Sequence, residues 1–521
     1  MFKNQPKGLM AAALSNMGER FGFYTMMAIL ALFLMTKYGL TDKQAGLIYS
    51  LFYALIYGLS IFGGVIADKT GKIKNVIITG LLLMTAGYVV MAIPSTTPSA
   101  SNAFYLTISC IGLFVIAFGN GLFKGNIQAI VGRLYDNPKY DKMRDSGFQI
   151  FYMFINVGAI FAPFFAIGVR NWFLKAHGFI YNSNLPDLCH GFINGTLSST
   201  DVTAYEGLVR SANQTGAALT NAQFANQYLD VFSKGFNLAF SVAIIAMLIS
   251  LAIFVINKNK LPDKMVQVGG TNEDGSMNKA EIKMTVQETK QRLHALYAVF
   301  GVVIFFWFSF HQNGLTLTYF AKDYVDLSQI HINLGFTSIV GAEIFSSVNP
   351  FFVVFLTPVI MWFFNKLRSK GKEPSTAKKI ALGMGIAAAA YLFLSIFSIA
   401  LPDKSTIGAA GAPMDMRLTP WIMIGMYFIL TVAELFISPL GISFVSKVAP
   451  PQYRGLMQGL WLGATAVGNF LVQFGTFFYN SLPVWATWAV FVGACAISMI
   501  VMFGMLNWLE RIIAKSSEAE A

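Results

Sequence analysis

The chain has 521 residues, of which 55% are hydrophobic and 12% are charged, and its mean hydropathy is +0.58. Soluble domains carry about 25% charged residues, so this composition excludes a soluble protein and predicts an all-α polytopic membrane protein. The net charge is +12, but the basic residues lie in short segments between apolar runs, which argues against a nucleic-acid-binding surface.

Twelve apolar runs are predicted to be transmembrane helices, because about 20 residues at ~1.5 Å per residue cross a hydrocarbon core of ~30 Å. They cover residues 10–36, 45–67, 75–94, 103–123, 148–169, 236–256, 294–319, 343–364, 380–400, 420–445, 456–478 and 484–508. The first run is full length and has no small-residue cleavage pattern, so we expect a retained helix rather than a signal peptide. The three cysteines offer no disulfide framework.

Lys and Arg are divided unevenly between alternate loops. Of the 37, 26 fall on the side that carries both termini, and only Arg20 and Lys124 fall within predicted spans. Cytoplasmic loops are enriched in Lys and Arg, so both termini are predicted to be cytoplasmic.

Two long polar segments divide the chain. The charged, Gly-containing segment 258–292 is predicted to be a cytoplasmic linker between two six-helix bundles, 1–257 and 293–521. The segment of about 171–235 is rich in Asn, Ser, Thr and Gly, and is predicted to be a solvated insertion on the outer face.

Several ionisable residues lie within or at the edge of predicted spans, where a charge is costly and usually faces a bundle interior or a water-filled cavity. Four of them carry the argument. They are Glu19 and Arg20 in the first span, Lys124 in the fourth and Glu434 in the tenth. Because a short peptide carries a carboxylate and an ammonium, a cavity with opposed charges between the two halves could bind it end to end. A neutral Glu19–Arg20 pair that only locks helices together is the alternative. Glu343, at the start of the eighth span, is predicted at the membrane interface.

Several motifs resemble those of known transporters. Gly64-Val-Ile-Ala-Asp68-Lys-Thr-Gly71-Lys72-Ile-Lys74 is similar to the signature loop of the major facilitator superfamily. Further stretches resemble the proton-coupled oligopeptide transporter family of that superfamily: Phe151-Tyr152-Met-Phe-Ile-Asn156-Val-Gly158, Phe306-Trp307-Phe-Ser-Phe-His311-Gln312, Ser347-Val-Asn349-Pro350, Ala433-Glu434-Leu-Phe-Ile-Ser438-Pro439 and Met457-Gln-Gly459-Leu-Trp461. The resemblance covers nearly the whole chain outside the insertion and the linker.

The resemblance implies a major facilitator fold, with two six-helix bundles that rock around a central site. It implies these substrate-binding residues: Arg20, Tyr24, Tyr53, Tyr57, Lys124, Asn156, Trp307, Asn349, Glu434, Ser438 and Trp461. Proton coupling or gating is predicted for Glu19, Arg20, His311 and Glu434, with His311 as our own hypothesis rather than a family residue. The asparagine amides could bond a peptide backbone, whereas any single aromatic residue is as readily explained by packing in a chain with 15% aromatic residues.

The chain departs from the family at two acids that the family links to proton coupling and gating. The family's first-helix pattern is Glu-x-x-Glu-Arg-Phe-x-Tyr-Tyr, and here Asn16 replaces its first Glu and Phe23 its first Tyr; His311 replaces the seventh-helix acid. An imidazole titrates between about pH 5 and 8 and could carry the proton, and a neutral, hydrogen-bonded His311 is the equal alternative. If His311 lies near Arg20, its protonation and carboxylate binding would favour each other.

We therefore predict secondary active uptake of di- and tripeptides, coupled to protons, by alternating access. A carrier of nitrate or organic anions, or a non-transporting peptide sensor, are the alternatives. No enzyme is predicted, because no nucleophile–base spacing is visible, and no metal or other cofactor is expected. The predicted partners are a small peptide, protons and the bilayer, with no nucleic acid, in a monomer that lies in a bacterial inner membrane.

Overall fold

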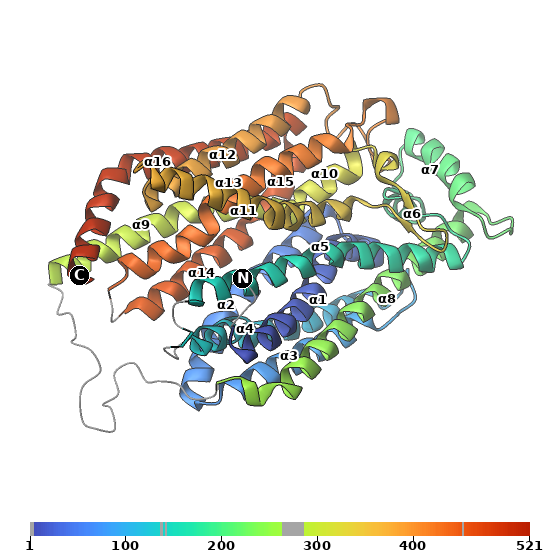
Figure 1. Cartoon of the computed structure of the whole chain (residues 1–521). Coiled ribbons are helices and arrows are strands. Elements are labelled where there is room, and N and C mark those ends of the chain that lie inside the picture. Colours follow the sequence, from blue (N-terminus) through green and yellow to red (C-terminus); the bar gives the residue numbers. More distant parts are fainter. Residues whose placement is uncertain (1–4, 136–138, 141–142, 263–285, 451–452, 521) are drawn as a thin grey trace.

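The computed structural model describes residues 5–135, 139–140, 143–262, 286–450 and 453–520 (Figure 1). The helices before residue 263 are α1 Lys7–Tyr38, α2 Asp42–Thr70, α3 Ile73–Ala92, α4 Asn102–Leu134, α5 Arg144–Ala176, α6 Leu185–Asn194, α7 Ser199–Ala212, α8 Asn221–Ile256 and the 3₁₀ turn η2 Lys258–Lys260. The helices after residue 285 are α9 Val286–Phe310, α10 Thr316–Tyr324, α11 Val348–Ser369, α12 Thr376–Phe397, α13 Pro420–Val448, α14 Arg454–Leu471, α15 Gln473–Ser481 and α16 Val484–Glu520.

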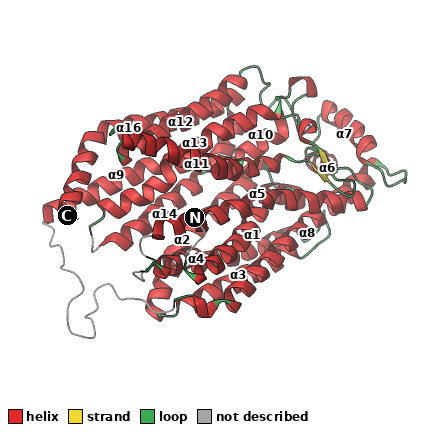
Figure 2. Cartoon of the chain, viewed as in Figure 1, coloured by secondary structure: helices red, strands yellow, loops and turns green. Residues whose placement is uncertain are grey.

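Short elements interrupt the second set of helices. They are the 3₁₀ turns η3 His311–Gly314, η4 Leu327–Ile330, η5 Ala342–Ser347 and η6 Met414–Met416, and the strands β1 Ile332–Asn333 and β2 Ser338–Ile339. The strands pair antiparallel, with Ile332 opposite Ile339 and Asn333 opposite Ser338. In the described part of the chain the rest of the regular structure is helical (Figure 2).

The helices form two groups that lie side by side. In the amino-terminal group, α1 packs against α5 and α8, and α3 and α2 pack against α4. In the carboxy-terminal group, α12 packs against α13 and α16, and α14 packs against α9. The groups meet where α2 contacts α14 and where α5 contacts α11 and η5. Figure 1 shows the first group in blue and green below the second group in yellow and red.

The ends of this assembly differ. One end carries α6 and α7 and is called the insertion end; the other carries the starts of α1 and α9 and the carboxyl terminus and is called the linker end (Figure 1). The predicted linker 258–292 falls largely on residues 263–285, outside the described residues. Capping boxes begin α2 at Thr41 with Gln44 and α8 at Thr220 with Gln223, which fixes both helix starts at the insertion end.

Most of the predicted spans are found. Eleven helical segments of the described residues are long and apolar enough to cross a membrane. The predicted span 456–478 is instead divided between α14 and α15 at Val472, so the number of twelve is not confirmed. The predicted span 294–319 lies within one long segment, 287–324, that turns through η3.

The insertion is shorter and more ordered than predicted. Because α5 continues to Ala176 and α8 begins at Asn221, it covers residues 177–220 rather than 171–235. One side of α6 is buried, with Leu185, Leu188 and Cys189 in the core. The predicted solvated insertion is therefore a folded cap.

Candidate functional site

The acid and base of the first helix form a closed pair. The Nε atom of Arg20 donates to Oε2 of Glu19 at 2.5 Å, and a terminal guanidinium nitrogen donates to Oε1 at 2.7 Å. Asn120 on α4 donates a further hydrogen bond to Glu19 Oε1 at 2.6 Å. Both side chains of the pair are buried. Glu19 thus compensates most of the positive charge that Arg20 would offer to a ligand. This arrangement is expected of a neutral ion pair that locks helices together.

Lys124 is a second cation near the Glu19–Arg20 pair and interacts electrostatically with both members. Its ammonium lies 3.5 Å from the ring centroid of Tyr57, and within the described part of the chain it has no carboxylate partner. Close approach of α2 and α4 creates this contact, because a Cβ added to Gly63 would lie 2.0 Å from the carbonyl oxygen of Gly121. This close packing of α2 and α4 makes Tyr57 and Lys124 neighbours.

Glu434 supplies the opposite charge from the carboxy-terminal group. Its Oε2 accepts a hydrogen bond from the amide of Asn349 on α11 at 2.8 Å. The same amide nitrogen donates to Thr431 at 3.0 Å, which fixes its orientation. Glu434 also interacts electrostatically with the hydroxyls of Tyr24 and Tyr57 on the other group of helices. Tyr57 therefore contacts the ammonium of Lys124 and interacts with the carboxylate of Glu434.

Tyr152 indicates that this region is open. It interacts electrostatically with Glu434, Tyr24 and Tyr57, yet its side chain is 42% exposed. Tyr24, Tyr57, Lys124, Asn349 and Glu434 are themselves only partly buried. Five of the predicted binding residues, on helices of both groups, are thus partly accessible.

His311 lies where the helix of its span is interrupted. It is the first residue of η3, between α9 and α10, and it is buried. Its Nδ1 contacts Oδ1 of Asn469 on α14, and Asn469 donates through Nδ2 to the carbonyl oxygen of Tyr53 at 3.5 Å. Because that amide nitrogen is the donor, Oδ1 accepts and Nδ1 of His311 carries the hydrogen, which leaves Nε2 as the basic atom.

Aromatic rings enclose the imidazole of His311. The ring of Tyr53 is 4.7 Å away, and that of Trp307 is stacked on it at 4.9 Å. His311 also interacts electrostatically with Lys124. Tyr53 and Trp307 therefore act here as packing around His311, and the imidazole joins helices of both groups.

Three further predicted residues have their described contacts within their own group of helices. Asn156 donates to the carbonyl oxygen of Tyr152 on its own helix, at 3.0 Å. Trp461 is buried against Gly441, where an added Cβ would lie 2.1 Å from the indole, and it packs on Phe300. Ser438 has a buried hydroxyl without a hydrogen-bond partner among the described residues.

A buried ion pair at the insertion end was not predicted. Arg170 of α5 donates to Glu343 of η5, and both side chains are fully buried. The guanidinium also lies over the ring of Tyr181 at 4.3 Å. Glu343 is therefore enclosed by protein, and its predicted depth at the membrane interface stays a prediction. The continuation of α5 beyond residue 169 is the reason for this enclosure, since it carries Arg170 into the protein rather than into a loop.

Further polar contacts join the two groups at the insertion end. Asn171 donates to the carbonyl oxygens of Ser338 and Val340 at 2.8 and 3.1 Å, and Lys322 pairs with Asp187 of α6. Toward the linker end, Gln149 contacts the Met361 sulfur of the other group at 3.9 Å. The structure is thus closed at the insertion end.

Comparison with known proteins identifies the family. The sequence matches the family model described as the POT family over residues 74–268 and 257–484. The chain belongs to the POT family. This POT-family chain is 28% identical over 475 residues to the peptide transporter YePEPT of Yersinia enterocolitica, covering 90% of this chain and 87% of that protein. It is 27% identical over 486 residues to a di-/tripeptide transporter of Lactococcus lactis, covering 90% and 88%.

Solved structures share the fold. A peptide transporter POT in complex with sulfate superposes with a TM-score of 0.69 at 23% identity, covering 98% of this chain and 96% of that one. Tetrameric PepTSo2 gives a TM-score of 0.60 at 20% identity, covering 97% and 99%. The resemblance stated from the motifs is confirmed at the level of the family and the fold. The monomeric state stays a prediction.

Proposed function

We propose that this POT-family chain takes up di- and tripeptides by alternating access, driven by an inward proton gradient. Family membership and the names of its relatives support the cargo. The observation that carries the proposal is that Lys124 and Glu434, which have opposite charges and come from different groups of helices, both interact with Tyr57. In the proposal, the peptide carboxylate binds at Lys124 and the peptide ammonium binds at Glu434.

The structure changes the role we propose for Arg20. Because Arg20 donates two hydrogen bonds to Glu19, which Asn120 also holds, Arg20 orients the first helix and contributes less to carboxylate binding than Lys124 does. Asn349 positions Glu434 through its amide. We propose Tyr24 and Tyr57 as hydroxyl donors to the bound peptide, and Asn156 as a donor only if it leaves its bond to Tyr152.

For proton coupling we propose Nε2 of His311 as the acceptor, with Glu434 and Glu19 as further candidates. The bond from Nδ1 to Asn469 fixes the tautomer that makes Nε2 basic. A proton at His311 and the positive charge of Lys124 repel each other, and a bound carboxylate at Lys124 relieves this repulsion. Proton binding and peptide binding then favour each other.

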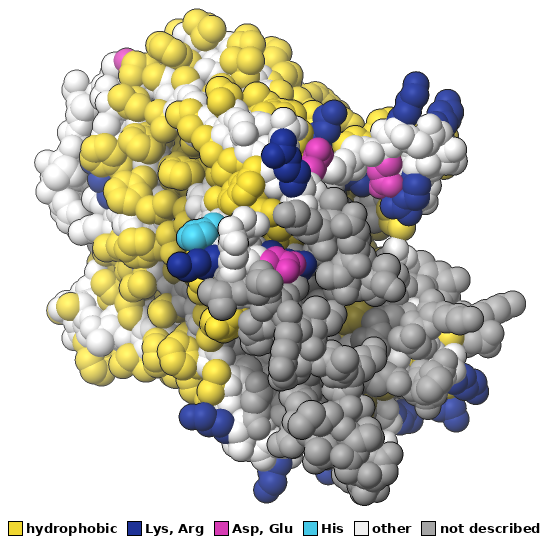
Figure 3. Space-filling model, turned by 90° about the vertical axis from the view of Figure 1, so that its left-hand side faces the viewer, with side chains coloured by type: hydrophobic (Ala, Val, Ile, Leu, Met, Phe, Trp, Pro, Cys, Tyr) yellow, Lys and Arg dark blue, Asp and Glu magenta, His cyan; other side chains and the backbone are white. Residues whose placement is uncertain are grey.

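The membrane orientation belongs to the proposal as well. We place the linker end in the cytoplasm of a bacterial cell, with α14 and α15 together as the eleventh of twelve spans in two six-helix bundles, 1–257 and 293–521. Figure 3, which views the linker end, shows Lys and Arg side chains around the grey atoms and few Asp and Glu, as expected for a cytoplasmic face.

Uptake of labelled dialanine into proteoliposomes, with and without an imposed proton gradient, tests the proposed function. Uphill accumulation that requires the gradient is expected. Accumulation without gradient dependence would contradict proton coupling, binding without accumulation would indicate a sensor, and uptake of nitrate in place of dialanine would indicate an anion carrier.

Variants at the two charges test the binding site. Each hydrogen bond to a charged group contributes about 1.5–3 kcal/mol, so Lys124→Gln and Glu434→Gln should each weaken dialanine binding by roughly 10- to 150-fold. N-acetyl-dialanine lacks the ammonium, so Glu434→Gln should reduce the preference for dialanine over this analogue, whereas Lys124→Gln should preserve it. Glu206→Gln, on α7 in the insertion, is the matched control and should bind normally.

A further inference from the structure

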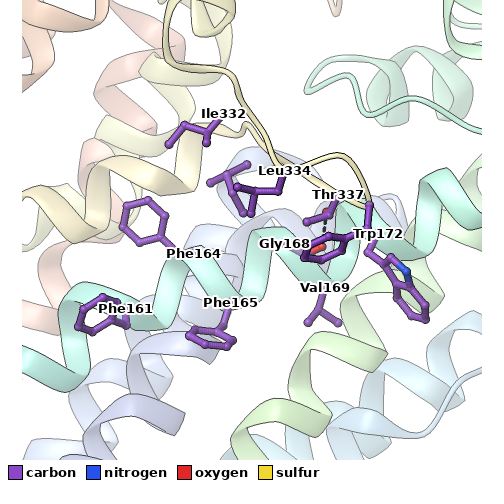
Figure 4. A pocket seen from close by; sticks show the side chains of 11 residues that line it. Phe161, Phe164, Phe165, Gly168, Val169, Trp172, Ile332, Leu334 and Thr337 are labelled. Atoms are coloured by element: carbon purple, nitrogen blue, oxygen red, sulfur yellow. Dashed lines mark hydrogen bonds between the residues drawn. The ribbon is translucent and has the colours of Figure 1, made fainter.

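An apolar groove runs along the seam between the two groups of helices. One wall is the outer side of α5, with Phe161, Phe164 and Phe165, and the other is the segment of β1 and β2, with Ile332 and Leu334 (Figure 4). The groove has a volume of about 620 Å³. Several of its side chains are exposed, among them Phe165 at 52% and Leu334 at 49%.

The lining offers nothing to a polar ligand. Thr337 is its only lining side chain with a polar oxygen, and this hydroxyl donates to the carbonyl oxygen of Gly168 at 2.7 Å. No charged side chain lines the groove. A zwitterionic peptide therefore finds no partner there, and the groove is separate from the site of Lys124 and Glu434.

The position of the groove identifies its surroundings. α5 belongs to a candidate membrane span, 147–176, so its exposed side meets hydrocarbon. From Phe161 to Trp172 the helix rises about 16 Å, close to the ~15 Å of one leaflet. Trp172 is 44% exposed, as is typical of a residue at the interface with the headgroups. Lys175 follows one turn later and is exposed.

We propose that this groove binds one acyl chain of a membrane glycerophospholipid, with the phosphate of that lipid at Lys175. The ammonium of Lys175 donates to the carbonyl oxygen of Gly335 and has further N–H groups for a phosphate oxygen. Phe161, Phe164 and Leu334 contact the chain. Because its two walls belong to different groups of helices, the bound chain adds apolar contacts across the seam while the insertion end is closed.

Photo-crosslinking tests this site without reference to transport. The full-length protein, one copy per nanodisc, is illuminated in phosphatidylethanolamine and phosphatidylglycerol that carry a diazirine on one acyl chain, and adducts are mapped by mass spectrometry. Adducts should concentrate on 161–172 and 332–339 relative to the exposed apolar surface around Ile500 of α16, which is 64% exposed. Equal labelling of both surfaces would overturn the proposal.

Matched variants make the test specific. Burial of one Leu side chain corresponds to about tenfold or more in occupancy, so Leu334→Asn should lower groove labelling about tenfold. Ile500→Asn should leave groove labelling unchanged, and retained dialanine binding by both variants shows that they are folded. Unchanged labelling of Leu334→Asn would refute the site. Crosslinks to a second copy in discs that hold several copies, without lipid adducts, would assign the groove to a protein interface and also overturn it.

The phosphate position is tested separately. Lys175→Gln should lower labelling by the phospholipid probe and leave labelling by a diazirine fatty alcohol unchanged. An equal effect on both probes, or none on either, would overturn the assignment of the phosphate to Lys175.

Discussion

The substitution Glu343→Gln should open the insertion end. Glu343 and Arg170 are fully buried and pair across the two groups of helices. The substitution removes the carboxylate charge and leaves the guanidinium of Arg170 buried, with the rings of Tyr181, Phe232 and Phe236 around it. A conformation in which water reaches Arg170 then becomes more favourable than the closed one.

The size of the effect follows from the burial of both partners. Removing one partner of a buried ion pair costs about 3–5 kcal/mol, because an uncompensated charge remains in a medium of low polarity. If opening hydrates Arg170, the closed-to-open equilibrium shifts by a factor on the order of 10²–10³. Replacing both partners by apolar residues, as in Arg170→Met with Glu343→Met, removes both charges and should keep the closed state populated. Lys234→Ala is the surface control, since its pair with Asp230 is partly exposed and worth about 0–1 kcal/mol.

Pulsed electron paramagnetic resonance measures this opening as the distance between spin labels at Ala103 and Asn333. Both positions are exposed, on α4 and on β1, and Cys110 is replaced by Ser so that the two remaining native cysteines, which are buried, do not take up label. With Glu343 unchanged, the distance between the two spin labels should have a single short value. In Glu343→Gln a second, longer distance between the labels should appear. An unchanged distance distribution in Glu343→Gln would refute the gating role of the pair. Equal opening in the double Met variant would show that charge burial is not the cause.

Three further predictions concern other contacts. Asn349→Ala removes the amide bond to Glu434, and should raise the KM for dialanine about tenfold, at ~1–1.5 kcal/mol, in liposome uptake; an unchanged KM would contradict the positioning role. His311→Gln should abolish proton-driven accumulation while exchange of labelled for unlabelled dialanine continues, and unchanged uphill uptake would exclude His311 as the proton carrier. Arg368 and then Lys379 hold the pKa of Glu373 down at about 2. Because this pKa lies below the unfolded value of about 4.3, the stabilisation is present above pH 4 and lost as the pH falls toward 2. Glu373→Gln should therefore lower the Tm by a constant amount between pH 5 and 8 and by less below pH 4; a difference independent of pH would contradict it.

The sequence predicted those features that depend on the residue type alone within a membrane span. Apolar runs predicted most helices, because a segment that crosses the membrane must form its backbone hydrogen bonds within the helix. It needs about 20 apolar residues to cross the hydrocarbon core. Lys124 and Glu434 could be selected for the same reason, since a charge in such a run needs a functional or structural partner. The structure places both near Tyr57, from two groups of helices that the sequence separates by 310 positions.

Other features depend on pairing that no local pattern contains. Arg170 and Glu343 are 173 residues apart, and the sequence around each one predicts only a charged residue at the end of a membrane span. The helix is interrupted at His311, where the sequence has no proline that would predict the interruption. Polar contacts from α14, including Asn469, accompany it. The folded cap was missed because its apolar residues are spread over short helices such as α6, which gives no long hydrophobic run.

The charges around the central site favour a zwitterion over an anion. Glu19 already compensates Arg20, so Lys124 and Glu434 are the groups that a ligand must satisfy. A peptide with free ends supplies one negative and one positive charge and leaves neither group unpaired. Nitrate satisfies Lys124 alone and leaves the carboxylate of Glu434 in a partly desolvated space, where an unpaired charge is costly. An anion would therefore need a proton on Glu434, so nitrate binding, where it occurs, should strengthen as the pH falls. In Glu434→Gln this dependence should be weaker, and the part that remains should be lost when His311 is also replaced by Gln.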